Sequence, residues 1–550
     1  MRLWLAFSTL FLATLFVFRA PFILLQSGAL SNADSLKSVL HDTLQSDAPK
    51  QSLLIVAIDT ASVKNIASDV FVGGVKTDSF VSPVLQVFPD HYALIDGVLT
   101  FRGNHLRAAP AFGTCTPSKK KLQKVWAFQT AFGTSNKGRS KNWGGGAGWT
   151  GQPALVQWPD SIKNLMNLKP EFKTKPNFVE VVQASLDGRI YFLDLETGKK
   201  TREPIDLKNP VKGSLSIDPR GYPLLYVGQG IPEYGAIGFR IFSLIDQSLL
   251  HFIAGKDTTA FRSWGAFDAS GLVNRDTDTF FIVGENGLFY SIKLNTQVDT
   301  TAKKISLAPK TIVYRYKVSG NPHIGIENSP AIYRNLAYFA DNGGSIQALD
   351  LQTMKPVWLF KGNDDTDASL TIDIENDTPF VYTGCEVDKQ GTSGFTYLRK
   401  LNGLTGAVVW EKPYKCQSVL GSSPVNGGLL ATSVIGKHHI SDRVIFTAAR
   451  AGGFNQGLIL ALHKSTGKEI WKYTQPNFSW SSPVAVYDST GKAYLVQCDC
   501  AGDMTLLDAQ TGKLLDKLSL NINIEASPAV FNDMIVVAVR GQHIYGVKLQ

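Results

Sequence analysis

The chain has 550 residues, of which 44% are hydrophobic and 18% charged, and its formal net charge is +9 at neutral pH. This balance is ordinary for a packed globular protein and excludes a largely disordered chain. The 49 glycines and 25 prolines, together with the scarcity of long runs of helix-forming residues, favour a turn-rich, all-β fold.

A hydrophobic N-terminal segment predicts export. An almost uninterrupted apolar run extends from Leu3 to Phe18, and Arg19 separates it from a second apolar stretch. The run has the length of a signal-peptide core and is borderline for a membrane-spanning helix. We therefore expect residues 1–30 to be a signal peptide or a membrane anchor, and the protein to be periplasmic, extracellular or membrane-anchored. The alternative is a buried hydrophobic helix.

Residues 31–115 are expected to form an N-terminal extension. A short amphipathic helix is indicated by the helical spacing of Leu36, Val39, Leu40 and Leu44, and residues 52–59 and 92–103 have the composition of strands. We expect this stretch to pack against the side or base of the remaining chain, and no motif in it indicates a particular chemistry.

The five cysteines, at 115, 385, 416, 498 and 500, suit an exported protein with one or two disulfides and a thiol left over. Cys385 and Cys416 are our preferred pair, although nothing in the sequence fixes the pairing. Cys498 and Cys500 would share one face of a strand. Since no nearby His or Cys completes a metal site, we interpret these two as buried structural thiols or a disulfide.

Two lysine-rich segments, 118–124 and 136–142, contribute to the positive charge. They lack the alternating aromatic residues of a surface on which bases stack. We interpret them as solvated loops and expect no nucleic-acid partner.

A repeated turn is the strongest signal in the chain. It occurs as TGKKTREPI at 197, TMKPVWLFK at 353, TGAVVWEKP at 405, TGKEIWKYT at 466 and TGKLLDKLS at 511. Aligned on this turn, related units recur roughly every 50 residues, a period typical of propellers and solenoids. Within a unit, two short strands follow a first strand that starts at a Ser-Pro or similar pair, and the Thr-Gly turn leads to a fourth.

Such four-stranded antiparallel sheets need neighbours on both faces, which radial stacking supplies. Eight units fit the chain, at about 149–202, 213–254, 264–300, 327–361, 368–412, 421–474, 480–520 and 525–550. We therefore predict an all-β, eight-bladed β-propeller of four-stranded antiparallel blades over residues 120–550. The last unit is one strand short, and residues 124–130 resemble the fourth strand at 469–475. We predict that this N-terminal strand completes the last blade and closes the ring.

The Thr-Gly turn with Trp358, Trp410 and Trp471, which we expect to dock between blades, resembles the repeat of the quinoprotein-like (PQQ-type) eight-bladed propellers. The resemblance covers roughly 124–550. Segments 97–113 and 148–158 resemble more particularly exported bacterial members of unassigned function. The family includes pyrroloquinoline quinone (PQQ) dehydrogenases and non-catalytic members, among them an outer-membrane assembly scaffold. The resemblance is therefore specific for fold and weak for activity.

The motifs of the enzymatic members are incomplete. As the resemblance implies, the alcohol dehydrogenases typically hold the quinone against a tryptophan and a disulfide of adjacent cysteines, and bind calcium with Glu, Asn and Asp. This chain has neither adjacent cysteines nor a C-x-x-C-H haem motif. It also lacks H-E-x-x-H and G-x-S-x-G. The glycine-rich stretch 143–149 lacks the Lys-Ser/Thr of a P-loop, and we interpret it as a flexible loop.

A candidate site follows from the propeller geometry, because residues just before each first strand gather around one mouth of the central channel. These are Trp149, Gln152, Trp264, Glu327, Asn328, Asp367, Trp480 and Glu525. Tryptophans and carboxylates around one opening suit a sugar, a cationic ligand, or calcium with a flat cofactor. Alternatively, the tryptophans pack between blades and the carboxylates accept backbone hydrogen bonds. The strongest candidates are Glu327, Asn328 and Asp367.

We therefore expect an exported, non-catalytic binding or scaffold propeller, monomeric, without a cofactor, and with a protein or glycan partner at the cell envelope. The alternative is a PQQ-dependent dehydrogenase with a divergent calcium and quinone site. A channel plugged by side chains would favour the non-catalytic scaffold. Convergence of Glu, Asn and Asp at metal-ligand distance would favour the dehydrogenase.

Overall fold

The structure, a computed structural model, describes residues 51–131, 146–421 and 424–550. The chain divides into Met1–Gln45 and Ser46–Gln550, and the first unit lies outside the described residues. So do the predicted signal peptide or anchor, the amphipathic helix around residue 40, the lysine-rich segment 136–142 and residues 143–145 of the glycine-rich stretch. In the described ranges, no helix has the length and apolar character needed to cross a membrane.

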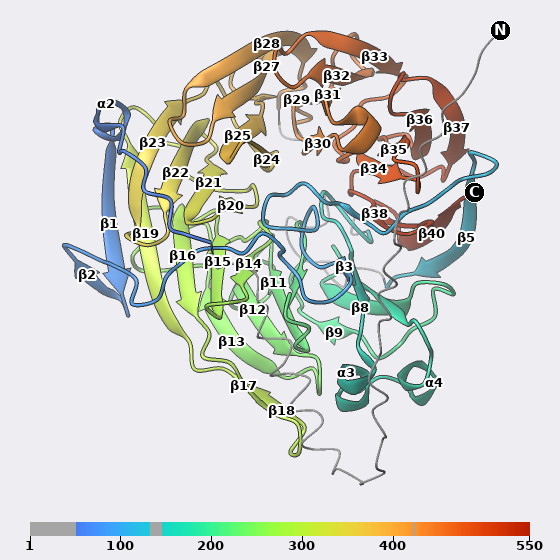
Figure 1. Cartoon of the computed structure of the whole chain (residues 1–550), viewed down its shortest axis with the longest axis horizontal. Helices are drawn as coiled ribbons and strands as arrows, with labels where there is room; N and C mark the ends of the chain where they lie inside the picture. Colours follow the sequence, from blue (N-terminus) through green and yellow to red (C-terminus); the bar gives the residue numbers. More distant parts are fainter. Residues whose placement is uncertain (1–50, 132–145, 422–423) are drawn as a thin grey trace, which may run out of the picture. The chain divides into compact units, whose positions relative to one another are not determined.

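Ser46–Gln550 contains eight antiparallel sheets arranged radially as the blades of a propeller (Figure 1). The strands are given from the channel outward. Blade 1 consists of β6 (Ala154–Gln157), β7 (Val179–Ala184), β8 (Arg189–Asp194) and β9 (Ile205–Asp206), and blade 2 of β10 (Ser216–Ile217), β11 (Leu224–Gly228), β12 (Gly238–Ser243) and β13 (Leu249–Ala254). Blade 3 consists of β14 (Leu272–Asn274), β15 (Thr279–Val283), β16 (Leu288–Lys293) and β19 (Lys310–Val318), and blade 4 of β20 (Ala331–Tyr333), β21 (Leu336–Ala340), β22 (Ser345–Asp350) and β23 (Lys355–Lys361).

Blade 5 consists of β24 (Thr371–Glu375), β25 (Thr378–Thr383), β27 (Ser393–Asn402) and β28 (Val408–Gln417), and blade 6 of β30 (Val434–Ile435), β31 (Arg443–Ala449), β32 (Gly457–His463) and β33 (Glu469–Gln475). Blade 7 consists of β34 (Val484–Tyr487), β35 (Ala493–Cys498), β36 (Asp503–Asp508) and β37 (Leu514–Ser519), and blade 8 of β38 (Ala529–Phe531), β39 (Met534–Ala538), β40 (His543–Leu549) and β5 (Leu122–Gln129). The predicted all-β, eight-bladed propeller is thus confirmed, including its closure: β5 pairs with β40 along its whole length.

Further elements decorate this ring. The short strands are β1 (Ile66–Val72) and β2 (Val75–Thr77), which extend the outer edge of blade 3, the hairpin β17 (Gln297–Asp299) and β18 (Lys304–Ser306), β3 (Gly97–Val98), β4 (Ala111–Phe112), β26 (Glu386–Val387) and β29 (Gly427–Gly428). The helices are α2 (Thr60–Val63), α3 (Asp160–Leu165), α4 (Pro170–Lys173) and the 3₁₀ turn η2 (His438–Ile440).

Two blades depart from the predicted boundaries. Blade 3 was expected to end near residue 300, but the β17–β18 hairpin is inserted there and the fourth strand is β19. In blade 6, the first strand is β30 at 434–435 rather than the stretch at residue 422. Both differences arise because an insertion shifts the strand while the regular turn remains in place.

The repeated turn has a local cause. In most of these turns the first residue is Asp or Asn, whose side-chain oxygen accepts hydrogen bonds from the backbone N–H groups two or three residues later and so stabilises the turn; in blade 6 this residue is His463. In four blades these bonds run from Thr197 to Asp194, from Gln352 to Asp350, from Thr405 to Asn402, and from Gln510 and Thr511 to Asp508.

The same turn also joins neighbouring blades. An outer-strand tryptophan of one blade donates its indole N–H to a backbone carbonyl at the turn of the next: Trp126 to Leu195 (2.8 Å), Trp358 to Gly403 (2.7 Å), Trp410 to Lys464 (2.8 Å) and Trp471 to Ala509 (3.1 Å). The turn glycine packs under the indole ring. The predicted docking of Trp358, Trp410 and Trp471 between blades is therefore confirmed, and Trp126 makes the equivalent contact where the ring closes.

Residues 97–115, which we call the channel segment, cross the channel and contact all eight blades. In blade order, these contacts are β3 with β6; Leu99 O with Ile217 N; Arg107 with Ser270 O; His105 O with Ile332 N; Leu106 O with Ile372 N; Arg102 with Ser433 O; Arg102 with Pro483 O; and β4 with β38. The extension was expected at the side or base of the propeller, but this part of it lies inside the ring.

Two fully buried arginines fasten the channel segment. Arg102 donates to the carbonyl oxygens of Ser433 (3.0 Å) and Pro483 (2.7 Å), and Arg107 donates to Pro330 O and Ser270 O among others. Their partners are backbone carbonyls and a hydroxyl, not carboxylates, and burial lowers the pKa of each guanidinium to about 9. Both remain charged at neutral pH and form charge-assisted hydrogen bonds.

Candidate binding site at the channel mouth

One repeat position links the blades around the channel. In five blades a Ser hydroxyl just before the first strand accepts a hydrogen bond from a backbone N–H of the preceding blade, at 2.8–3.1 Å. These bonds run from Gln152 to Ser214, Ser270 to Ser329, Ser329 to Ser369, Thr432 to Ser482 and Ser482 to Ser527. They satisfy N–H groups that would otherwise be buried without an acceptor.

The residue two positions before this hydroxyl position faces a pocket of about 360 Å³ at the channel mouth. In seven blades this residue lines the pocket: Thr150, Lys212, Asp268, Glu327, Asp367, Leu430 and Trp480. Phe101 of the channel segment also lines it. Blades 2 to 5 supply charged residues, whereas blades 6, 7 and 1 supply Leu430, Trp480 and Thr150, so the wall has a charged side and a less polar side.

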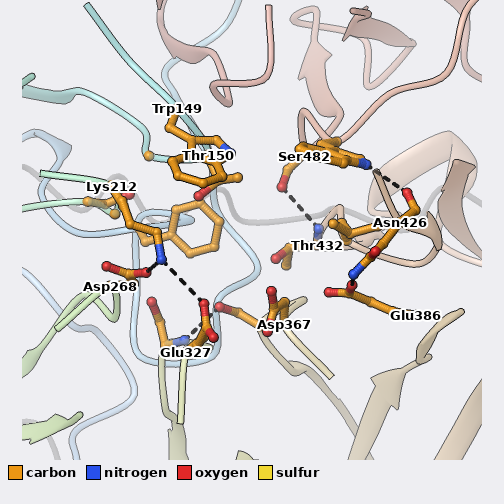
Figure 2. A pocket seen from close by; sticks show the side chains of 18 of the residues that line it. Trp149, Thr150, Lys212, Asp268, Glu327, Asp367, Glu386, Asn426, Thr432 and Ser482 are labelled. Carbon is orange, nitrogen blue, oxygen red and sulfur yellow. Dashed lines mark hydrogen bonds and ion pairs between the residues drawn. The ribbon is translucent and has the colours of Figure 1, made fainter. Parts of the chain in front are cut away.

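On the charged side, Lys212 lies among three carboxylates, Asp268, Glu285 and Glu327, which we call the lysine triad. Figure 2 shows Lys212 with Asp268 and Glu327. Its Nζ forms a close ion pair with Asp268 and lies 3.5 Å from an oxygen of each glutamate. Burial alone would lower the pKa of Lys212, but the three negative charges raise it well above its usual value. Lys212 is therefore held as an ammonium ion.

A second set of carboxylates, Asp365, Asp367, Glu386 and Asp388, comes from blade 5 and the adjoining β26 region. Burial, followed by the charge of a neighbouring carboxylate, raises the pKa of Asp365, Asp367 and Glu386 well above the ordinary range. Asn426 donates to Glu386 at 2.8 Å, and Lys389 contacts Asp365 and Asp388. Negative charges packed so closely favour either a bound proton or a bound cation.

Four of the predicted site residues line this pocket: Trp149, Glu327, Asp367 and Trp480. Trp149 has Lys212 Nζ and the Arg540 guanidinium each 5.2 Å from its ring centre. Trp480 donates its indole N–H to Asn426 O at 3.1 Å.

The other four predicted residues, Gln152, Trp264, Asn328 and Glu525, are not among the lining residues. Gln152 binds the backbone of Arg102 and Pro528, so it anchors the channel segment. Asn328 is buried and its amide bonds to Ala340 and Thr366. Glu525 accepts from Asn523 and lies 3.5 Å from Arg540. Trp264 is half-buried before blade 3, four residues ahead of Asp268.

All five cysteines are free thiols in the structure, and four of them are buried, Cys500 being half-buried. Cys385 and Cys416 are not bonded to each other, so their predicted disulfide stays a prediction. Burial raises the pKa of the Cys416 thiol to about 12, which makes it unreactive at neutral pH.

Sequence reasoning missed Lys212, Asp268, Glu285, Asp365, Glu386 and Asp388. Lys212 and Asp268 occupy the same repeat position as Glu327 and Asp367, and strict alignment on the Ser position would have found them. Glu285 and Glu386 instead follow the second strands of blades 3 and 5, where the repeat carries no charged residue in common.

Comparison with known proteins supports this architecture. No protein-family model matches the chain. Among solved structures, it is similar to the quinohemoprotein alcohol dehydrogenase from Comamonas testosteroni and to ADHIIG from Pseudomonas putida HK5. Each gives a TM-score of 0.54 at 12% identity, over 82% of this chain and 80% of that one. The chain has the quinoprotein-type propeller fold. At this identity the likeness shows the fold alone.

Among curated proteins, the chain is similar to the outer membrane protein assembly factor BamB of Legionella pneumophila (strain Paris), with 24% identity over 213 residues. The match covers 37% of this chain and 46% of that protein, less than half the length of the relative. Together with the fold, this match bears out the quinoprotein-like repeat predicted from the sequence.

The residues at the mouth do not fit a calcium site made by Glu, Asn and Asp. The amide of Asn328 is committed to backbone groups on both its nitrogen and its oxygen. The carboxylate of Glu327 lies 3.5 Å from the ammonium of Lys212, and a divalent cation beside this ammonium would be repelled. Cys498 and Cys500 are not among the residues that line the pocket.

Proposed function

We propose that this protein is an exported, non-catalytic binding or scaffold propeller whose ligand or partner binds at the channel mouth. The observation that carries the proposal is the channel segment, which fills the ring by contacting every blade yet leaves a pocket of about 360 Å³ beside Phe101. A pocket of this size, walled by rigid strand ends, suits a small ligand or a single protruding side chain.

Two further observations support a role at the cell envelope. The apolar run Leu3–Phe18 has the composition of an export signal. The relative from Legionella pneumophila is an outer membrane protein assembly factor, which favours a protein partner over a glycan. Fractionation of cells that express the full chain tests export, and a pool confined to the cytoplasm would contradict it.

A thermal melt of the full chain with PQQ and calcium together distinguishes this proposal from a dehydrogenase. Specific binding at a hundredfold excess over Kd adds about 2.7 kcal/mol of stability, enough for a visible rise in Tm. We expect PQQ and calcium together to raise the Tm no more than calcium alone does, because the residues at the mouth do not fit a calcium and quinone site. A PQQ-dependent rise that disappears in Asp367→Asn would overturn the proposal and call for an oxidation assay.

A further inference from the structure

We propose that the channel-mouth pocket binds an organic cation, an ammonium or guanidinium group, against Asp365, Asp367 and Glu386. Such a group belongs either to a small amine or to the lysine or arginine side chain of a partner. The inference rests on the proposed function, since it names the ligand chemistry of the same mouth.

The first argument is uncompensated charge. Lys212 is engaged by the lysine triad, and Lys389 contacts Asp365 and Asp388. Among the described residues, no Lys, Arg or His forms an ion pair with Asp367 or Glu386. These two carboxyls face the same space in Figure 2. A buried carboxylate without a positive partner is costly, so a cationic ligand would be strongly attracted.

The second argument is unused hydrogen-bonding capacity. Oε1 of Glu386 and Oδ1 of Asp365 are buried and receive no hydrogen bond from a protein N–H or hydroxyl group, and the carboxyls of Glu386 and Asp367 are close enough to share a proton, which a bound cation would displace. Glu386 is only 1% exposed and Asp365 9%, yet both line the pocket. Native proteins rarely leave such atoms unsatisfied. A ligand that brings several N–H donors would satisfy them.

The spacing of the oxygens argues against a metal ion. In the described part of the chain, only the lysine triad brings three carboxylates within 4.8 Å of one another, and Lys212 already occupies it. The oxygens of Asp365, Asp367 and Glu386 do not converge in this way. They suit a larger cation whose N–H donors point in several directions, such as a guanidinium group with its five donors.

The opposite wall suits the carbon part of such a ligand. Leu430 and Trp480 lie on the less polar side, and Phe101 and Trp149 also line the pocket. Trp149 already lies 5.2 Å from two cationic side chains. Aromatic faces attract cations and shield alkyl chains from water. An aliphatic amine or guanidine could therefore contact carboxylates at one end and rings along its length.

Calorimetric titration of the full chain with agmatine, which carries both a guanidinium and an ammonium group, tests the proposal. We expect saturable binding that weakens at least tenfold in Glu386→Gln, the size of effect expected when a charge-assisted hydrogen bond is lost. The matched control is Glu203→Gln, since the side chain of Glu203 is 74% exposed and lies outside the pocket. It should bind as the wild type does.

Two further measurements keep the result interpretable. Glu386→Gln conserves volume and removes a buried acid, so its Tm should equal or exceed that of the wild type, which shows that it folds. Burial and the charge of Asp367 raise the pKa of Glu386, so cation binding should release protons. Titrations in two buffers with different heats of ionisation measure this release.

The outcomes separate cleanly. Tighter binding of the peptide acetyl-Gly-Arg-Gly-amide than of agmatine would identify a partner side chain, and the reverse order a small amine. Absence of agmatine and peptide binding, equal binding by Glu386→Gln, or Glu386-dependent binding of calcium alone would overturn the inference. None of these results would alter the PQQ and calcium melt, so the scaffold proposal would stand or fall separately.

Discussion

Lys212 Nζ lies 3.5 Å from a carboxylate oxygen of Glu327, although the two residues come from different blades. The same ammonium contacts Asp268 and Glu285, so it takes the place that a metal ion would have among three carboxylates. The arrangement explains how a strongly acidic mouth can exist in a protein whose net charge is +9: the repeat places acids at adjacent blades, and one lysine neutralises part of them.

Replacing this lysine should create a metal site. In Lys212→Met the three carboxylates, all within 4.8 Å of one another, lose their cation, and oxygen ligands at this spacing suit calcium. We expect calcium to raise the Tm of Lys212→Met but not that of the wild type. Lys200→Met is the control, since Lys200 is 40% exposed and pairs only loosely with Glu203, at 3.8 Å.

An unchanged Tm in calcium for a folded Lys212→Met would show that the carboxylates retain protons instead. Burial raises the pKa of both Asp268 and Glu285, so the melt should be repeated at pH 8.5, where ionisation is more complete. Failure there as well would contradict the prediction.

The turn glycines give a second prediction. Gly406 has a φ of 72°, and an added Cβ would lie 2.7 Å from the indole ring of Trp358. Gly406→Ala therefore combines left-handed backbone strain with a steric clash. Gly320→Ala carries only the strain, because Gly320 has a φ of 80° and nothing within 4 Å.

We expect Gly406→Ala to cost about 2 kcal/mol more than Gly320→Ala in denaturant unfolding, the usual cost of overpacking. Equal losses would mean that Trp358 moves aside freely and that the contact between blades contributes little.

The fold could be predicted from the sequence because a single turn carries two functions. In several blades an Asp or Asn stabilises the local chain reversal, and at four blade junctions the turn glycine packs against the tryptophan of the adjacent blade, so these repeats specify both a strand pair and a neighbour. The closing strand was found for the same reason, since residues 124–130 retain the tryptophan of the repeat, Trp126, although the turn that precedes it in other blades is missing.

The site could be predicted only in part. Glu327 and Asp367 were found because they immediately precede a recognisable first strand, whereas for blade 3 the expected start at Trp264 lies four residues ahead of Asp268. The channel segment could not be placed, because its contacts join residues that are far apart in the sequence. Its two arginines bind backbone carbonyls, which every sequence provides, so no complementary residue marks their partners.

The arginines of the channel segment should be essential for stability. Arg107→Met would leave the carbonyl oxygens of Pro330, Phe101 and Ser270 without a donor in a buried place. Each such loss costs about 1–3 kcal/mol, so we expect a total of at least about 3 kcal/mol in urea unfolding.

The control for this change is Arg189→Met, because Arg189 is partly exposed and its ion pair with Asp187 is long, at 3.9 Å. Its loss should cost within about 1 kcal/mol. If the two variants were equally stable, the channel segment would not be held by its guanidinium bonds.

His105 makes the channel segment sensitive to acid. The ring is buried beside Phe88 and Tyr92, with centroids 5.6 and 5.9 Å away. Burial, reinforced by the charge of Arg107, lowers its pKa to about 3. Between that value and the ordinary pKa of about 6.5, the unfolded chain binds a proton that the folded chain does not. The unfolding free energy must therefore fall as pH falls through this window.

His105→Phe keeps a ring but removes the titration, so at pH 4.5 it should recover about 2–3 kcal/mol of the stability that the wild type loses relative to pH 7.5. The acids at the mouth act with the opposite sign, since the raised pKa values of Asp367 and Glu386 stabilise the folded state as pH falls. Because they are common to both proteins, the difference between the urea unfolding free energies isolates His105. An exposed-site variant, His323→Phe, should follow the wild type, and identical pH dependence in all three proteins would contradict the assignment.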